Sequence, residues 1–267
     1  MHKYFQIFKI SFQQEFAYRL NFVMWRARNV MQIILTFFLW NTVFYDPSRE
    51  VFGYNKEKIL TYVFGILVLR AIVLSARAVD MAGEIANGDI TNYLLKPVSY
   101  FKYWFTRDIA SKTLNLSFAG VEALILFLIL KPNIFLQTDF LMIILFIVSV
   151  AIAVTLFFYI LFLVNLVTFW MPENGWAAQF LFVVILTEFL SGGAFPIDIL
   201  PPALQHILYG LPFPYLLFFP LQVYLGKISG LAIARGILTG GLWIMVLAFL
   251  TRIIWPRGLK RYSAEGR

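Results

Sequence analysis

Six long apolar stretches divide this sequence, and each is bounded by charged residues or by proline and glycine. A helix needs about 20 apolar residues to cross the hydrocarbon core of a bilayer, where every backbone polar group must be bonded within the protein. Only 13% of the residues are charged, whereas about a quarter are charged in ordinary soluble domains. We therefore predict an all-α polytopic membrane protein, with one transmembrane domain over residues 1–267 and spans at about 23–44, 59–76, 106–130, 140–170, 176–190 and 231–255.

Between the fifth and sixth predicted spans, residues 191–226 are apolar enough to be mistaken for a seventh span. This segment contains six prolines, and each proline removes a backbone hydrogen-bond donor and would interrupt a continuous helix. Irregular backbone at membrane depth is tolerated only where it is buried in protein or lines a cavity. We therefore expect short re-entrant or interfacial helices, with Gly192 and Gly193 turning the chain out of the fifth span.

Lysine and arginine are distributed unequally between the two sides of the predicted spans. If the N-terminus lies inside, the outer side keeps only six of them, namely Arg49, Lys56, Lys58, Lys131, Lys227 and Arg235. This asymmetry predicts that both termini are cytoplasmic. The net charge of +8 then indicates contact with anionic membrane lipids, and we expect no nucleic acid partner.

The N-terminal segment carries an aromatic stripe. Phe5, Phe8, Phe12 and Phe16 recur at helical spacing, and polar residues occupy the other face. This pattern predicts an amphipathic helix in the inner membrane interface, although a cytoplasmic extension of the first span is an alternative. No small-residue cleavage site follows the segment, so we expect the first span to be retained.

The stretch "EIANGDITNYLLKP", residues 84–97, interrupts the apolar sequence between the second and third spans. Asn87 and Gly88 are typical of a helix end, Asp89 of a helix start, and Pro97 of a second end. The resulting two-turn helix would place Ile90, Tyr93 and Leu94 on one face. A solvated loop would explain the polarity but not an apolar face, so we favour a cytoplasmic docking surface formed by residues 80–100.

Two carboxylates fall inside predicted spans, Glu122 in the third and Glu188 in the fifth. Carboxylates in hydrocarbon are costly and usually face a bundle interior or a wet path, which makes both residues candidates for a transport pathway. A purely structural hydrogen bond is about as good an explanation for Glu122. On the cytoplasmic side Asp80 and Glu84 share a helix face, but an ion pair with Arg77 explains them better than a metal site.

Several classes of catalyst have no support in the sequence. The chain has no cysteine and only two histidines, which lie far apart, so we predict no metal site. It also lacks the phosphate-binding loop of nucleotide hydrolases and the motifs of serine and zinc hydrolases. We predict no catalytic residues, and any active process must draw its energy from an ion gradient or from another chain.

Three regions resemble the permease subunit of bacterial type-2 ATP-binding-cassette exporters, in particular their six-span, drug-resistance-like branch. They are "EIANGDITNYLLKPVSYFKYW", the proline-rich segment "FLSGGAFPIDILPPALQHILYGLPFPYLLFFPLQVYLG", and the tail "WPRGLKRYSAEGR". The proline-rich segment is the most specific of the three, and the resemblance covers essentially the whole chain. None of these motifs is catalytic.

The resemblance implies that the chain binds no cofactor and works with separate ATPase subunits, which would hold ATP and Mg²⁺. It also implies a second permease, identical or related, in the bacterial cytoplasmic membrane. The residues that map to coupling with the ATPase are Glu84, Gly88, Asp89, Ile90, Tyr93, Leu94 and Pro97. The outer, re-entrant part of the pathway maps to Gly192, Gly193, Pro196, Pro201 and Pro212, with Glu188 beside them.

Two other classes remain open. An ion-coupled secondary transporter is favoured by Glu122 and Glu188, but no inverted repeat relates the two halves of the chain. A membrane-embedded lipid-modifying enzyme is less favoured, because the cytoplasmic side lacks an acidic or histidine cluster. A lipid, a hydrophobic drug and a peptide suit the apolar composition about equally as substrates.

Overall fold

The computed structural model describes residues 2–15, 19–46 and 50–262, and this part of the chain is helical, with no strand beyond one isolated bridge between Val51 and Tyr54. All-α architecture is therefore confirmed. The longer helices are α1 (His2–Glu15), α2 (Arg19–Val43), α3 (Lys56–Leu69), α6 (Tyr100–Leu130), α7 (Phe140–Leu166) and α12 (Leu231–Arg261). The shorter ones are α4 (Met81–Ala86), α5 (Thr91–Leu94), α8 (Gly175–Gln179), α9 (Thr187–Leu190), α10 (Pro202–Tyr209) and α11 (Phe218–Tyr224).

Three described helices are long and apolar enough to cross a membrane, namely Tyr100–Leu130, Phe140–Phe169 and Leu231–Arg261. A fourth is possible if Lys56–Leu74 and Arg77–Ala86, which meet at a 44° bend, count as one broken span. Helix α2 has 25 residues, about 37 Å at 1.5 Å per residue. The chain is therefore a multi-pass membrane protein, and the count of six spans stays a prediction.

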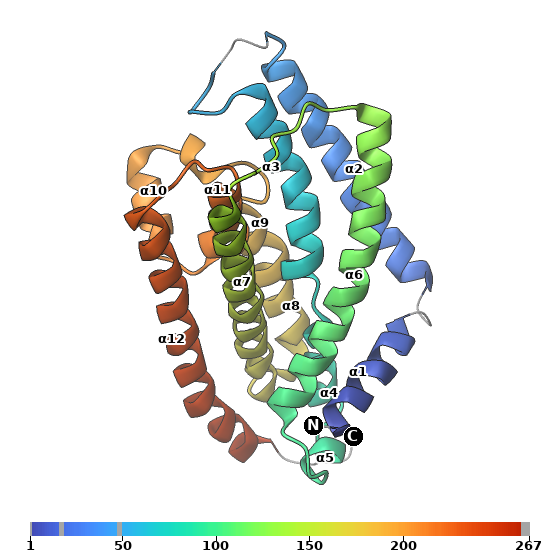
Figure 1. Ribbon diagram of the computed structural model, residues 1–267. Helices are drawn as coiled ribbons and strands as arrows, with labels where there is room; N and C mark the ends of the chain where they lie inside the picture. Colours follow the sequence, from blue (N-terminus) through green and yellow to red (C-terminus); the bar gives the residue numbers. More distant parts are fainter. Residues whose placement is uncertain (1, 16–18, 47–49, 263–267) are drawn as a thin grey trace.

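The long helices run side by side, with α8 and α9 among them, and the other short elements lie at the two ends of the bundle (Figure 1). At one end lie α4, α5, the oblique α1 and the C-terminal end of α12. At the other end lie α10 and α11, which belong to the proline-rich segment. Short helices in that segment are confirmed, and their depth in the membrane remains a prediction.

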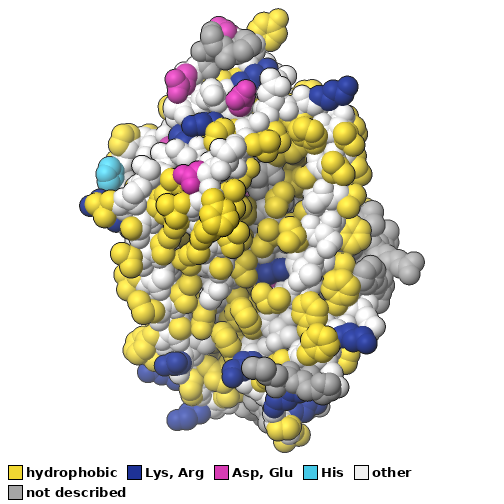
Figure 2. All heavy atoms as spheres, in the orientation of Figure 1, with side chains coloured by type: hydrophobic (Ala, Val, Ile, Leu, Met, Phe, Trp, Pro, Cys, Tyr) yellow, Lys and Arg dark blue, Asp and Glu magenta, His cyan; other side chains and the backbone are white. Residues whose placement is uncertain are grey.

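Helix α7 is the centre of the packing. It contacts α11, α12 and α8, and Phe157, Phe158 and Leu161 are fully buried. The face of the bundle seen in Figure 2, by contrast, is largely hydrophobic, and most of its charged side chains lie towards the two ends. That distribution suits a protein whose sides face lipid.

Glycines let α12 approach its neighbours closely. A β-carbon on Gly240 would lie 2.8 Å from Cγ2 of Ile152, and one on Gly236 would lie closer still to Cε2 of the Phe219 ring. Because lipid is as apolar as the helix surfaces, helix association in membranes depends on such close packing. The helix also continues through Pro256 to Arg261, six residues beyond the predicted end, and Gly258 packs there on Phe169.

Two helices contain π-helical turns that local propensity does not predict, at Arg70–Leu74 after α3 and at Phe180–Leu186 between α8 and α9. Such turns are rare and occur often at functional sites, because they leave backbone carbonyls with altered partners. The first π-helical turn is followed by extended backbone at Ser75 and Ala76. The predicted second span therefore ends in a break, from which the chain bends into residues 80–100.

Helix α1 packs against α6. In α1 the rings of Phe8 and Phe12 stack with centroids 6.3 Å apart and are half-buried, while Phe5 is 67% exposed. One part of the predicted aromatic stripe thus faces the protein and another part faces outward. Phe16 lies outside the described residues.

Candidate functional site

The predicted coupling segment, residues 80–100, folds as two short helices joined by a tight turn. Helix α4 ends at Ala86, and Gly88 adopts φ of +85°, a left-handed conformation that favours glycine and closes helices. The helix end at Asn87 and Gly88 is therefore confirmed. The second element, α5, is a single turn from Thr91 to Leu94 rather than the expected two turns.

Asp89 does not cap α5, so that prediction is wrong. No side chain caps this helix, because backbone carbonyls of the preceding turn already accept its first free amides. The amide of Asn92 donates to the Asp89 carbonyl at 3.0 Å, and that of Tyr93 donates to the Ile90 carbonyl at 3.0 Å. The Asp89 residue is exposed, which leaves its carboxylate free for a partner.

The apolar residues of this segment face in different directions. Ile90 is fully buried and Leu95 is 83% exposed. Tyr93 is half-buried, with its ring 4.7 Å from that of Tyr103. An open pocket at the tip of the segment is lined by Glu84, Asp89, Asn92, Tyr93, Leu95 and Lys96. Ile90 thus anchors the segment from within, and the exposed residues of the tip are Asp89, Asn92, Leu95 and Lys96. The side chain of Leu94 lies outside the described set.

Glu84 ties the segment to the start of α6. Its carboxylate accepts a hydrogen bond from the Tyr100 hydroxyl at 3.2 Å and lies 3.7 Å from the Arg107 guanidinium. Burial raises the pKa of the Glu84 carboxyl above its ordinary value, and these partners, together with Tyr93, oppose that rise. Pro97, which precedes α6, accepts a hydrogen bond on its carbonyl from the Lys3 ammonium of α1 at 2.8 Å.

The C-terminal end of α12 holds the same segment from the other side. The Tyr262 hydroxyl donates to the Gly88 carbonyl at 2.7 Å and lies 3.1 Å from the Thr91 hydroxyl. Its ring also contacts Phe169, with the centroids 6.1 Å apart. These contacts, which we call the C-terminal clasp, join the coupling segment to the last long helix.

A second set of polar contacts surrounds the break at residues 73–79, and the sequence patterns did not single it out. The Lys112 ammonium of α6 donates to the carbonyls of Val73, at 2.8 Å, and Ser75. Asp108, one turn earlier, accepts the Arg77 amide at 3.1 Å and lies 3.3 Å from Lys112.

Helices α7 and α8 also contribute polar contacts to the break at residues 73–79. The side-chain amide of Asn165 donates to the Ala78 carbonyl at 2.7 Å, and that of Gln179 donates to the Val79 carbonyl at 2.7 Å. Three neighbouring helices therefore hold the irregular backbone that leads into the coupling segment. A signal was present in the sequence, since Asp108 and Lys112 are oppositely charged and four residues apart.

Both carboxylates predicted within the bundle form ion pairs with arginines of other helices. Glu122 pairs with Arg26 of α2 through two parallel hydrogen bonds, from Nε at 2.6 Å and from Nη2 at 2.5 Å. Glu188 of α9 pairs with Nη2 of Arg70, at the end of α3, and also accepts from Gln32 of α2 at 3.0 Å. The sequence predicted the carboxylates but not their partners, which lie 96 and 118 residues away along the chain.

The chain turns sharply after α9. Gly192 has φ of +82°, and a β-carbon there would lie 2.8 Å from the Tyr62 hydroxyl oxygen and 2.9 Å from Cβ of Phe218. Tyr62 in turn donates to the Gly192 carbonyl at 2.6 Å. Gly193 lies against the Arg70 guanidinium, which donates to its carbonyl at 3.0 Å. The two glycines thus occupy a turn that other residues would not fit.

The prolines of the segment mark its corners. Pro196 and Pro212 are buried, the first before a single helical turn at Ile197–Ile199 and the second before one at Phe213–Tyr215. Pro201 is exposed and precedes α10. Proline is well tolerated at these positions because the first amides of a helix have no intrahelical partner.

Asp198 forms a polar cluster at the end of the bundle that holds α10 and α11, and the sequence patterns did not predict it either. Its carboxylate accepts hydrogen bonds from the Lys227 ammonium at 2.8 Å, from Gln222 at 3.0 Å, and from the Tyr54 hydroxyl at 3.0 Å. Burial lowers the pKa of Lys227, and Asp198 counteracts that fall. The cluster ties the proline-rich segment to the loop before α3.

Comparison with known proteins adds the family. No curated protein matches the sequence significantly. In the described part of the chain, no group of three or more histidine, cysteine, aspartate or glutamate side chains is placed to hold a metal ion. The sequence profile of the ABC-2 family transporter proteins matches residues 30–266. Because that match covers most of the chain, the protein belongs to the ABC-2 family of transporters and is a transmembrane permease of the type-2 ATP-binding-cassette class.

Proposed function

We propose that this permease is one half of an ATP-driven exporter, and that a separate ATPase drives it through the coupling segment. The observation that supports the proposal is a folded, accessible element at one end of the bundle, α4 to α5, which is tied to the long helices directly and through the backbone that leads into it. Tyr262, at the end of α12, bonds Gly88 within the element. Lys112 of α6 and Asn165 of α7 bond the preceding break, at Ser75 and Ala78. Movement of its tip would therefore displace the helices that these contacts join.

The family and the charge asymmetry support the other parts of the proposal, namely the partner subunits and the orientation in the membrane. ATP and Mg²⁺ bind to the partner ATPases, and a second permease, identical or related, completes the pathway between the two copies. Both termini are cytoplasmic, and the membrane is the bacterial cytoplasmic membrane. Closure of the ATPases shifts the population of the paired permeases towards an outward-open state, so the energy comes from the partner chains.

Leu95→Asp tests the docking surface directly. Leu95 is 83% exposed, so the substitution leaves the fold intact and places a charge where we expect an apolar contact. We expect the amount of ATPase that co-purifies with the permease, or the transport per ATP hydrolysed, to fall by about tenfold or more, as for a central interface residue. Tyr93→Asp, on the more buried side of α5, should act in the same direction.

Leu136→Asp is the matched control, because Leu136 is 67% exposed and lies in the loop at the opposite end of the bundle. It should leave ATPase binding and coupling unchanged. Normal ATPase binding together with normal stimulation in both coupling-segment variants would contradict the assignment.

An ion-coupled secondary transporter is the second candidate, and the buried carboxylates Glu122 and Glu188 favour it. Each is paired with an arginine, which makes it a poor proton carrier until the pair opens. Transport that stops on addition of an uncoupler while ATP is maintained would support this candidate. A lipid-modifying enzyme would instead be supported by turnover of a lipid by the purified chain alone.

A further inference from the structure

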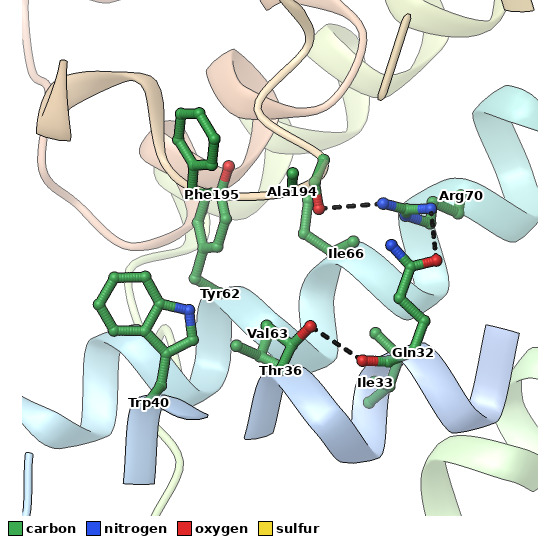
Figure 3. Close-up of a pocket in the computed structure, with 11 residues that line it drawn as sticks. Gln32, Ile33, Thr36, Trp40, Tyr62, Val63, Ile66, Arg70, Ala194 and Phe195 are labelled. Atoms are coloured by element: carbon green, nitrogen blue, oxygen red, sulfur yellow. Dashed lines mark hydrogen bonds between the residues drawn. The ribbon is translucent and has the colours of Figure 1, made fainter. Parts of the chain in front are cut away.

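A small, partly open cavity lies between α2, the end of α3, and the chain just after Gly192. Its volume is about 10 Å³, room for about one water molecule. Arg70 and Gln32 form one end of it, and Trp40, Tyr62 and Phe195 form the other (Figure 3). Gly193 also lines the cavity and accepts a hydrogen bond from Arg70. The cavity therefore has a polar end and an aromatic end within the bundle.

The ion pair at the polar end differs from the other Arg–Glu pair of the bundle. Arg26 and Glu122 meet fork to fork, with both carboxylate oxygens bonded. Arg70 uses one nitrogen, Nη2, for one oxygen of Glu188, and the same nitrogen also bonds the Gly193 carbonyl. The first pair is geometrically complete, whereas the second is held by a single contact.

Arg70 retains unused binding capacity. Its Nε is buried and makes no hydrogen bond within the described part of the chain, and its Nη1 makes only a long bond, of 3.4 Å, to Gln32. A guanidinium offers five donors in a planar fork that matches a carboxylate or a phosphate. A buried donor without a partner is costly, so the site favours an acceptor that can bond Nε and Nη2 together.

We propose that Arg70 recognises the anionic group, a phosphate or a carboxylate, of the transported molecule, and that Glu188 occupies its place when the site is empty. The aromatic end of the cavity takes the first part of an apolar chain, so the substrate class is an anionic amphipath. Because the empty cavity is too small for such a group, binding displaces Glu188 together with the chain at Gly193–Phe195. The inference rests on the proposed exporter function and names its substrate class.

The test uses the purified permease with its co-purified ATPase in phosphatidylcholine nanodiscs. The probe is 12-bromododecyl phosphate, whose bromine quenches nearby tryptophan, and the signal from Trp40 is isolated by comparison with Trp40→Phe. Arg70→Gln should weaken binding by about tenfold or more, as expected for loss of a charged hydrogen bond. Glu188→Gln should tighten binding several-fold, because the internal competitor has lost its charge.

The two variants, Arg70→Gln and Glu188→Gln, should therefore change the affinity in opposite directions. If the ion pair had only a structural role, both variants would bind the probe more weakly. Glu173→Gln, a change of the same type at an exposed glutamate that does not line the cavity, is the matched control and should leave the affinity unchanged. If Arg70→Gln does not fold, Arg70→Lys keeps the charge without the fork and should show intermediate weakening.

Equal binding by Arg70→Gln and wild type, or weaker binding by Glu188→Gln, would overturn the inference while leaving the exporter assignment standing. Absence of any co-purifying ATPase would instead count against the exporter function, because the binding measurement does not depend on it. Inorganic phosphate is the second arm. Competition by it at the same concentration as the amphipath would support Arg70 as the anion site and assign the anion to a free solute.

Discussion

Lys112 carries its charge inside the bundle, with its side chain 5% exposed and that of Asp108 fully buried. Its ammonium donates to two backbone carbonyls and lies 3.3 Å from the Asp108 carboxylate. Such a pair adds little net stability by itself, but removal of one partner leaves the other charge buried and unpaired. The pair therefore acts chiefly to fix the break at residues 73–79 in one geometry.

Lys112→Met should lower the free energy of unfolding by about 3 kcal/mol, because Asp108 would keep a buried charge without a partner. The double variant Lys112→Met with Asp108→Asn should recover part of that loss. Thermal and denaturant unfolding in detergent would measure both. Equal losses in the single and double variants would show that the carbonyl contacts, and not the charge pair, set the stability.

Gly192→Ala should destabilise the protein by about 1–3 kcal/mol, since an alanine β-carbon meets Tyr62 and Phe218 and the left-handed backbone is strained for alanine. Gly120→Ala is the control: Gly120 lies in α6 with open space around it, and alanine should be neutral or stabilising by up to about 1 kcal/mol. Thermal and denaturant unfolding in detergent would measure both changes. A neutral Gly192→Ala would mean that the turn can relax.

Among the helices, apolar length was enough to predict α6, α7 and α12, because a span must satisfy its own backbone and its length is set by the bilayer. The end of α4 at Gly88 was also predictable, since left-handed backbone is a local property of glycine. The direction in which Ile90 and Tyr93 face was not, because it depends on contacts with distant helices. The arginine partners of Glu122 and Glu188 could not be predicted from the sequence for the same reason.

The C-terminal clasp is an example of such a distant contact, since Tyr262 lies 174 residues from Gly88 along the chain. Tyr262→Phe removes the hydroxyl that bonds both Gly88 and Thr91. We expect a loss of about 1 kcal/mol of stability and a lower ratio of transport to ATP hydrolysis, with ATPase binding unchanged.

A double-mutant cycle with Thr91→Val should give a coupling energy of about 0.5 kcal/mol or more, as for residues in direct contact. Tyr45→Phe, a change of the same type at a tyrosine that is 88% exposed, serves as the control. It should change neither the stability nor the ratio of transport to ATP hydrolysis. An unaltered transport ratio in Tyr262→Phe would show that the clasp does not transmit force.

Across the whole molecule, α12 connects the two ends. Near its start Gly236 lies against Phe219 of α11, and near its end Gly258 lies against Phe169. These contacts are about 33 Å apart along the helix at 1.5 Å per residue. A rigid helix held tightly at both ends, with the clasp beyond its second contact, is suited to link events at the coupling segment to the proline-rich segment.

The number and direction of the spans can be tested because the chain has no native cysteine, so every single cysteine introduced is a unique label site. With six spans and cytoplasmic termini, Asn133→Cys and Ser229→Cys should react with a membrane-impermeant maleimide on intact cells. Ser99→Cys and Lys260→Cys should react only after permeabilisation. These four positions are exposed, so access is decided by the side of the membrane. If the proline-rich segment crossed the bilayer completely, Lys260→Cys and Asn133→Cys would both react from outside, and the re-entrant interpretation would fail.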